Sequence, residues 1–109
     1  MNSIPRSEHP KPQFRRDSWM NLNGQWAFEI DNGRSGKARC LNAMDAQLSD
    51  RIIVPFCPQS ELSGVNHKDF LSGVWYRRTF ELTKEQLSGR VVLHFGAVDY
   101  RCEAFVNGV

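Results

Sequence analysis

The stretch that decides the fold runs from residue 73 to residue 82 and reads Gly-Val-Trp-Tyr-Arg-Arg-Thr-Phe-Glu-Leu. Apolar and polar side chains alternate along most of it, which is the pattern of a β-strand with one buried face. Tyr76, Phe80 and Leu82 are expected on the buried face, and the polar residues between them on the opposite face. The stretch therefore predicts the strongest strand of the chain.

Two arginines follow one another inside this strand. Successive side chains of a strand point to opposite faces, so Arg77 and Arg78 cannot clamp one anion together. Arg78 interrupts the apolar face, and we expect it near the rim of the sheet in a structural ion pair. Asp99 and Glu103 are the expected partners.

Outward from this strand, the same criterion predicts four shorter ones, at residues 25–30, 51–54, 90–95 and 100–106. Alternation within two of them gives a set of inward-facing side chains. These are Trp26, Phe28, Ile30, Val91, Leu93 and Phe95.

Turn-forming residues separate the strands. Asn-Gly pairs at residues 23–24 and 107–108 predict tight turns, and the second pair is typical of the start of a two-residue hairpin. Asp-Asn-Gly at residues 31–33 is expected to end the strand before it. Residues 33–50 are predicted to form a long loop with at most one helical turn.

Two shorter connections are also expected to be ordered. Prolines at both ends of the 55–58 stretch stiffen the loop that continues to residue 64. Thr83 and Gln86 have the spacing of a capping box, so a single helical turn is predicted there, with Gly89 as a left-handed stop.

Several strands with almost no helix predict an all-β fold, and specifically an antiparallel β-sandwich of the jelly-roll, galactose-binding-domain-like kind. Residues 1–18, which hold three of the five prolines, are expected to form an extended arm, and residues 19–109 a partial sandwich. Five strands are fewer than the roughly eight of a jelly roll. We therefore expect an incomplete core, a natural polypeptide that continues after residue 109, and poor solubility or dimerisation of the piece alone.

Composition excludes several classes of function. Hydrophobic residues make up 40% and charged residues 24% of the 109 residues, and the net charge is +2 with both signs interspersed, so a nucleic-acid surface is not expected. No apolar run has the length of a signal peptide or a membrane span, which favours a cytoplasmic protein. The three cysteines lack metal-ligand spacing and are expected to be reduced, so neither a metal nor a cofactor is predicted.

Four segments together resemble the N-terminal sugar-binding domain of family 2 glycoside hydrolases, the β-galactosidase, β-glucuronidase and β-mannosidase relatives. The matching segments read DSWMNLNGQW at residues 17–26, IVPFCPQS followed by LSG at 53–64, VWYRRTF at 74–80, and LHFGAVDY followed by VNG at 93–108. Gln59 stands where the family commonly has Glu. The segments occur in the family's order and cover nearly the whole chain from about Pro10.

The resemblance implies a non-catalytic domain of an enzyme that hydrolyses O-glycosidic bonds in carbohydrate metabolism. In the family, an immunoglobulin-like domain and a (β/α)₈ barrel follow this domain, and the barrel carries both catalytic glutamates. No catalytic residue is therefore expected in this chain, whose own carboxylates fall at strand ends, on polar faces and in turns. The alternative is a carbohydrate-binding module with its own sugar affinity. A homo-oligomer is left open.

One loop gathers polar side chains that could contact a sugar. By resemblance to the family, in which loops of this domain help close the sugar pocket, Asn66, His67 and Asp69 are expected to bind substrate hydroxyls. The alternative is a solvent-exposed loop that only connects two strands. Trp75, on the polar face of its strand, is predicted to contact another domain or, as a second alternative, to stack on a sugar, whereas Trp26 is expected in the core.

Overall fold

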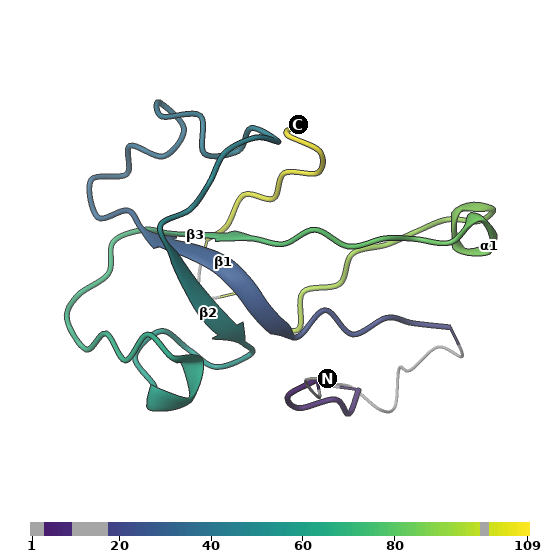
Figure 1. The fold of residues 1–109 in the computed structure, drawn as a ribbon, viewed down its shortest axis with the longest axis horizontal. Coiled ribbons are helices and arrows are strands. Elements are labelled where there is room, and N and C mark those ends of the chain that lie inside the picture. Colours follow the sequence, from purple (N-terminus) through teal and green to yellow (C-terminus); the bar gives the residue numbers. More distant parts are fainter. Residues whose placement is uncertain (1–3, 10–17, 99–100) are drawn as a thin grey trace.

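A three-stranded antiparallel sheet forms the centre of the molecule (Figure 1). The computed structural model describes residues 4–9, 18–98 and 101–109. The strands are β1 (Gly24–Ile30), β2 (Asp50–Val54) and β3 (Val74–Arg77), in the order β2-β1-β3. A short 3₁₀ helix, η2 (Glu61–Ser63), precedes β3, and one α-helical turn, α1 (Lys84–Leu87), follows it.

The first face of the sheet is apolar, as the alternation predicts. Phe28 of β1 lies opposite Tyr76 of β3, with ring centroids 5.1 Å apart in an edge-to-face arrangement, and Trp26 lies opposite Ile52 of β2. Phe28 is 0% exposed and Ile52 is 1% exposed. Phe28 and Ile52, together with Leu41 of the following loop, form the core, because burial of apolar area is the main favourable term in folding. Tyr76, which was expected to be buried, is 40% exposed, and Trp26 is half-buried.

The second face of the sheet is covered by the long loop between β1 and β2. Arg77 of β3 donates from both terminal nitrogens to the carbonyl oxygens of Ala43 and Met44, and Glu29 of β1 pairs with Arg39 at 2.7 Å. The loop contains no regular helix, as expected, although one i to i+4 hydrogen bond joins Arg39 to Ser35. Polar contacts therefore hold the loop against this face.

Arg78 lies on the opposite side from Arg77, as predicted, but its expected ion pair with Glu103 is wrong. Its guanidinium donates to the carbonyl oxygens of Leu22 and, at 3.0 Å, of Asn23, just before β1. Glu103 pairs with Lys37 instead, at 2.6 Å. Backbone carbonyls ahead of the neighbouring strand lie closer to Arg78 than any acidic side chain of the described residues, and Asp99 lies outside those residues.

Beyond β3 the chain forms a long arm that runs out to α1 and returns beside itself (Figure 1). The predicted capping box is present, with the Thr83 hydroxyl accepting from the Gln86 amide and the Gln86 side chain accepting from the Thr83 amide. Ser88, the residue after the helix, is in the right-handed conformation, and Gly89 is not left-handed, so the left-handed stop expected at Gly89 is wrong.

The strand predicted at residues 73–82 is confirmed only in its first half, and two later strand predictions are wrong. Strand β3 ends at Arg77 rather than at residue 82, and neither 90–95 nor the described part of 100–106 forms a strand. A strand requires a neighbouring backbone to pair with, and neither stretch pairs with β1, whose two edges are taken by β2 and β3. Val91, Leu93 and Phe95 do not face inward but are about half exposed, at 52%, 47% and 54%.

The two Asn-Gly turns have different outcomes. Asn107 and Gly108 have φ of 51° and 84°, and Val106 and Val109 exchange both backbone hydrogen bonds, which is the predicted two-residue hairpin turn. Asn23 and Gly24 form no turn, because Gly24 already begins β1. There the Asn21 side chain accepts from the Asn23 amide and holds the approach to the strand.

The described residues thus form a small β-rich fold, mostly strand and coil, with a three-stranded antiparallel sheet and almost no helix. Most of the predicted N-terminal arm lies outside the described residues. Within the described part, no helix has the length and apolar character needed to cross a membrane.

Candidate functional site

The loop at residues 64–70 leaves η2 through a well-defined cap. The Ser60 hydroxyl accepts from the Ser63 amide at the helix start, and Gly64 follows the helix in the left-handed conformation with φ of 83°. Ser63 is 0% exposed, and its hydroxyl accepts from the Val65 amide at 3.1 Å. These local hydrogen bonds fix the direction in which the loop starts.

A backbone hydrogen bond ties the middle of the loop to the stretch before η2. The His67 amide donates to the Pro58 carbonyl oxygen at 2.9 Å, which joins the loop to the proline-stiffened stretch before η2. Next to it, Asn66 is in the left-handed region with φ of 50°, a conformation that asparagine tolerates better than most residues. The backbone therefore turns sharply at Asn66 and places His67 toward the body of the protein.

The three predicted site residues lie in this one loop but in different environments. Asn66 and Asp69 are exposed, and His67 is half-buried. Its ring nitrogen Nε2 is shielded from solvent and has no hydrogen-bond partner among the described residues. No hydrogen bond joins the three side chains to one another within the described part of the chain. They share a loop but do not form a hydrogen-bond network.

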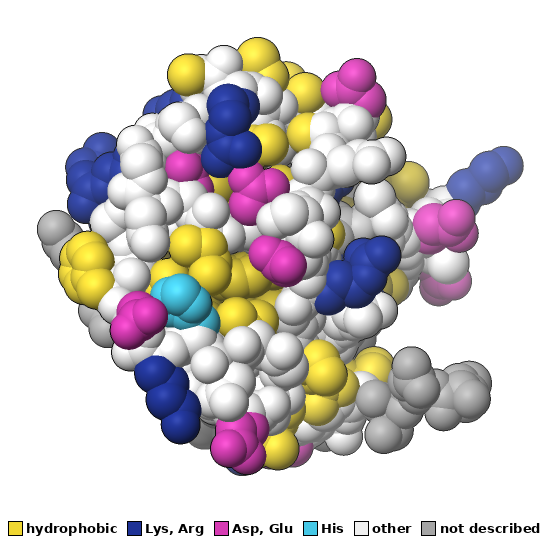
Figure 2. Space-filling model, turned by 60° about the vertical axis from the view of Figure 1, so that its left-hand side comes forward, with side chains coloured by type: hydrophobic (Ala, Val, Ile, Leu, Met, Phe, Trp, Pro, Cys, Tyr) yellow, Lys and Arg dark blue, Asp and Glu magenta, His cyan; other side chains and the backbone are white. Residues whose placement is uncertain are grey.

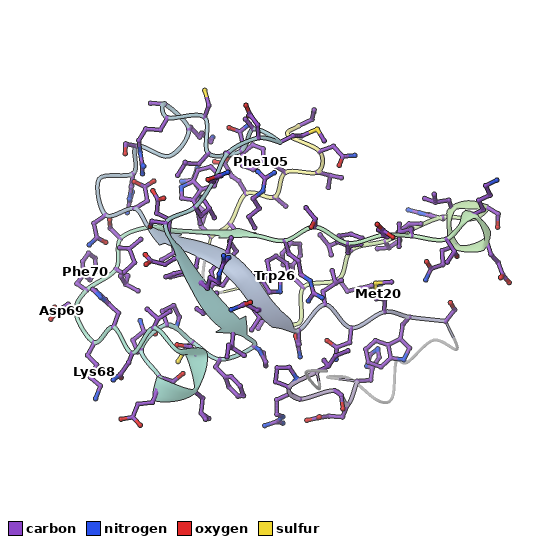
Figure 3. The ribbon with its side chains drawn as sticks, in the orientation of Figure 1. Met20, Trp26, Lys68, Asp69, Phe70 and Phe105 are labelled. Atoms are coloured by element: carbon purple, nitrogen blue, oxygen red, sulfur yellow. The ribbon has the colours of Figure 1, made fainter. Side chains whose placement is uncertain are left out.

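The outer part of the loop projects from the molecule. Lys68, Asp69 and Phe70 lie along its edge, pointing away from the sheet (Figure 3). Phe70 is 82% exposed. The loop therefore offers both polar and aromatic groups to a partner.

On the side of the molecule that Figure 2 brings forward, hydrophobic side chains gather in a hollow, with acidic and histidine side chains at its rim.

Trp75 lies on the polar face of β3, as the alternation indicates, and is half-buried. Its indole nitrogen donates to Asp31 at 3.0 Å, and its ring stacks on Phe105 with centroids 5.9 Å apart and planes 16° from parallel. Gly36 lies so close that a Cβ there would be 2.0 Å from the indole nitrogen. Contacts within the chain thus hold the ring that was predicted to touch a sugar or another domain.

Asp31 collects hydrogen bonds from the start of the long loop. It is 5% exposed and accepts from the Ser35 and Gly36 amides at 2.9 and 2.8 Å, besides the Trp75 indole. These donors, the Ser35 amide first, lower the pKa of Asp31 from 3.8 to about 2. An acid with so low a pKa is ionised at neutral pH and cannot act as a general acid.

Glu29 is held in the same way. The hydrogen bond from Arg39 is the main reason that its pKa is lowered, with a further bond from the Ser49 amide at 3.2 Å. Lys37 likewise lowers the pKa of Glu103. A glycosidase acid requires the opposite shift, so these carboxylates serve as structural acceptors.

A depression that the sequence did not predict lies between the sheet and the long loop. It has a volume of about 330 Å³ and is lined by Ala27, Ala46, Gln47, Leu48, Arg51 and Arg77. Ala27 lies opposite Arg51 on one side and opposite Arg77 on the other. The strand register brings Arg51 and Arg77 to the same depression. The two arginines are separated by 25 positions in the sequence, and no pattern in that stretch predicts that they lie close together.

The described residues contain no group of three or more His, Cys, Asp or Glu side chains placed to hold a metal ion. All three cysteines are free and exposed. Comparison of the sequence with protein-family models finds no match, and neither does comparison with curated proteins.

Proposed function

We propose that this chain is the non-catalytic, N-terminal sugar-binding domain of a family 2 glycoside hydrolase, and that its sheet is one layer of an antiparallel β-sandwich. The four sequence segments that resemble the family support this assignment. Strands β1, β2 and β3 each overlap one of them, at residues 24–26, 53–54 and 74–77. Three of the four segments therefore meet in one sheet, which is expected if they belong to one fold.

The unpartnered Nε2 atom of His67 is the observation that carries the functional part of the proposal. Leaving a buried polar atom without a hydrogen bond costs about 1–3 kcal/mol. A sugar hydroxyl both donates and accepts, so it can satisfy that nitrogen in either tautomer. The exposed Asn66 and Asp69 side chains, in the same loop as His67, supply further donors and acceptors for neighbouring hydroxyls.

In this proposal the chemistry takes place on the barrel, where the family has its two glutamates. The loop at residues 64–70 forms one wall of the pocket mouth and orients the sugar. The lowered pKa values of Asp31 and Glu29 support a non-catalytic role for this domain, because both carboxylates already accept hydrogen bonds from donors within it.

The test is Asp69→Ala in the polypeptide that carries this domain together with the barrel. Loss of a hydrogen bond from a hydroxyl to a carboxylate is worth about 1.5–3 kcal/mol, so kcat/KM is expected to fall by roughly 10- to 100-fold. The matched control is Lys68→Ala, which removes an exposed side chain from the adjacent position. An unchanged kcat/KM for the Asp69 variant would refute the proposed role of the loop.

A second candidate function is a binding module with its own affinity for sugars. It is favoured by the exposure of Asn66, Asp69 and Phe70, which are accessible without any other domain. Isothermal titration of this domain with simple sugars separates the two functions. Binding with a millimolar or smaller dissociation constant favours the module, and the absence of heat favours the wall of a pocket completed by the barrel.

A further inference from the structure

The depression between the sheet and the long loop is lined by two arginines and by no acidic residue. Its volume of about 330 Å³ lies at the lower end of the range of ligand pockets. Ala27 of β1 lies between the two arginines, and its small side chain leaves the space above the central strand open. Neighbouring strands are about 4.8 Å apart, so the Arg51 and Arg77 backbones lie roughly 10 Å from each other across it.

The two guanidinium groups differ in how many hydrogen bonds they make within the protein. Arg77 donates to two backbone carbonyl oxygens, which are neutral, so its positive charge is not cancelled. Three of its five N–H donors have no partner among the described residues. Arg51 is exposed, and its guanidinium makes no hydrogen bond or ion pair within the described part of the chain. Arg51 is thus available to a ligand, while Arg77 is held in place.

No acidic side chain is among the six residues that line the depression. Glu29, the nearest acidic residue along β1 on the same face, is neutralised by Arg39 at 2.7 Å. The side-chain amide of Gln47, another lining residue, is a neutral donor. Two positive charges with no lining carboxylate favour a negatively charged occupant, because each guanidinium can make charge-assisted hydrogen bonds to an oxyanion.

We propose that this depression binds a small oxyanion, a carboxylate or phosphate group, between Arg51 and Arg77. Arg77, fixed by the Ala43 and Met44 carbonyls, positions the anion, and Arg51 closes over it. None of the lining residues belongs to the loop at residues 64–70, so this site and the proposed sugar contact can fail separately.

The experiment titrates inorganic phosphate into the ¹⁵N-labelled chain and follows the amide signals of Ala46, Gln47 and Leu48. Sodium chloride at matched ionic strength is the reference, because non-specific screening acts on all charges. Saturable shifts with a millimolar dissociation constant are expected. A parallel titration with acetate distinguishes the sources of the oxyanion: tighter binding of phosphate indicates a phosphate ligand, and equal or tighter binding of acetate indicates a carboxylate.

Arg51→Ala is the decisive variant, and it is expected to weaken phosphate binding at least tenfold. Arg51→Lys, which keeps the charge and replaces the fork of donors, is expected to weaken it by a smaller factor and serves if the alanine variant does not fold. The matched control is Arg90→Ala, which removes one exposed positive charge beside α1. Non-saturating shifts in the unmodified chain, or equal weakening by the Arg51 and Arg90 substitutions, would overturn the proposal.

Discussion

Asp31 links strand and loop at the level of a single residue. Its carboxylate stands at the end of β1 and accepts from donors on the following loop and from Trp75 on β3. One side chain therefore ties three parts of the chain that are up to 44 residues apart. Because every donor favours the ionised form, the same contacts that order the loop also set the pKa.

This coupling predicts an acid-sensitive contribution to stability. The pKa of Asp31 is about 2 in the folded protein and 3.8 ordinarily, so the unfolded chain binds the proton more readily between these values. The contribution is complete above about pH 4 and is lost as the pH falls through about 2. In Asp31→Asn, the decrease in melting temperature between pH 5 and pH 2 is expected to be shallower than in the unmodified chain.

Thermal melts followed by circular dichroism across this pH range make the measurement. Asp45→Asn is the matched control, because Asp45 is exposed and makes no hydrogen bond or ion pair with the described residues. Its profile should follow that of the unmodified chain. Equal slopes for the Asp31 variant and the unmodified chain would contradict the assignment.

For single residues, the sequence predicts to which face of a strand a side chain points, but it does not predict which residues that side chain contacts. Strand alternation placed Trp75 opposite Tyr76 and separated Arg77 from Arg78, because those relations follow from neighbouring positions. The partners of Trp75 and Arg78 are 44 and 55 residues away, and no local pattern encodes such a distance. His67 was predicted as a sugar contact, but its buried Nε2 atom is visible only in the structure.

Among the elements, the contact of the long loop with β3 depends on a residue without a side chain. A Cβ at Gly36 would approach the Trp75 indole nitrogen to 2.0 Å, whereas a Cβ at Gly33 would have no atom within 4 Å. Gly36→Ala is therefore expected to destabilise the fold by about 1–3 kcal/mol, the usual cost of overpacking. Gly33→Ala, a change of the same size in the same loop, is the matched control.

Urea unfolding of both variants, followed by tryptophan fluorescence, gives the free energies of unfolding. The Gly36 variant should unfold at lower urea concentration and the Gly33 variant at nearly the original one. If the Gly36 variant is as stable as the Gly33 variant, Trp75 is not packed against the loop in the way described.

Strands, turns and caps that depend on residues close together in the sequence could be predicted from it. Strands β1 and β2 follow from alternation and short apolar runs, and the capping box at Thr83 and the turn at Asn107-Gly108 follow from side-chain chemistry within a few residues. The stretch at residues 90–95 has the same alternation but forms no strand. Alternation reports what a strand could bury and does not report whether a partner backbone lies beside it.

For the whole molecule, the balance between buried and exposed apolar surface is unusual. Few large side chains of the described residues are fully buried, whereas Val91, Leu93 and Phe95 on the returning arm are each about half exposed. Contiguous exposed apolar surface on a soluble domain favours association. The chain is therefore expected to self-associate at micromolar concentrations and above.

Sedimentation velocity over a concentration series tests this expectation. Replacing Leu93 and Phe95 together by lysine should shift the distribution toward monomer, because it adds charge to the apolar stretch. His94→Lys adds charge at the exposed position between them and should have a smaller effect. A monomeric unmodified chain throughout the series would show that this surface does not drive association.

The order of the sheet has a consequence for how the chain is made. Its central strand, β1, emerges from the ribosome before either neighbour, and its second neighbour is finished only with Arg77. Both edges of β1 stay unprotected during the synthesis of the long loop, and one stays so until β3 appears. Slowing translation between residues 54 and 74 would lengthen the time for which the nascent sheet can pair with the wrong backbone.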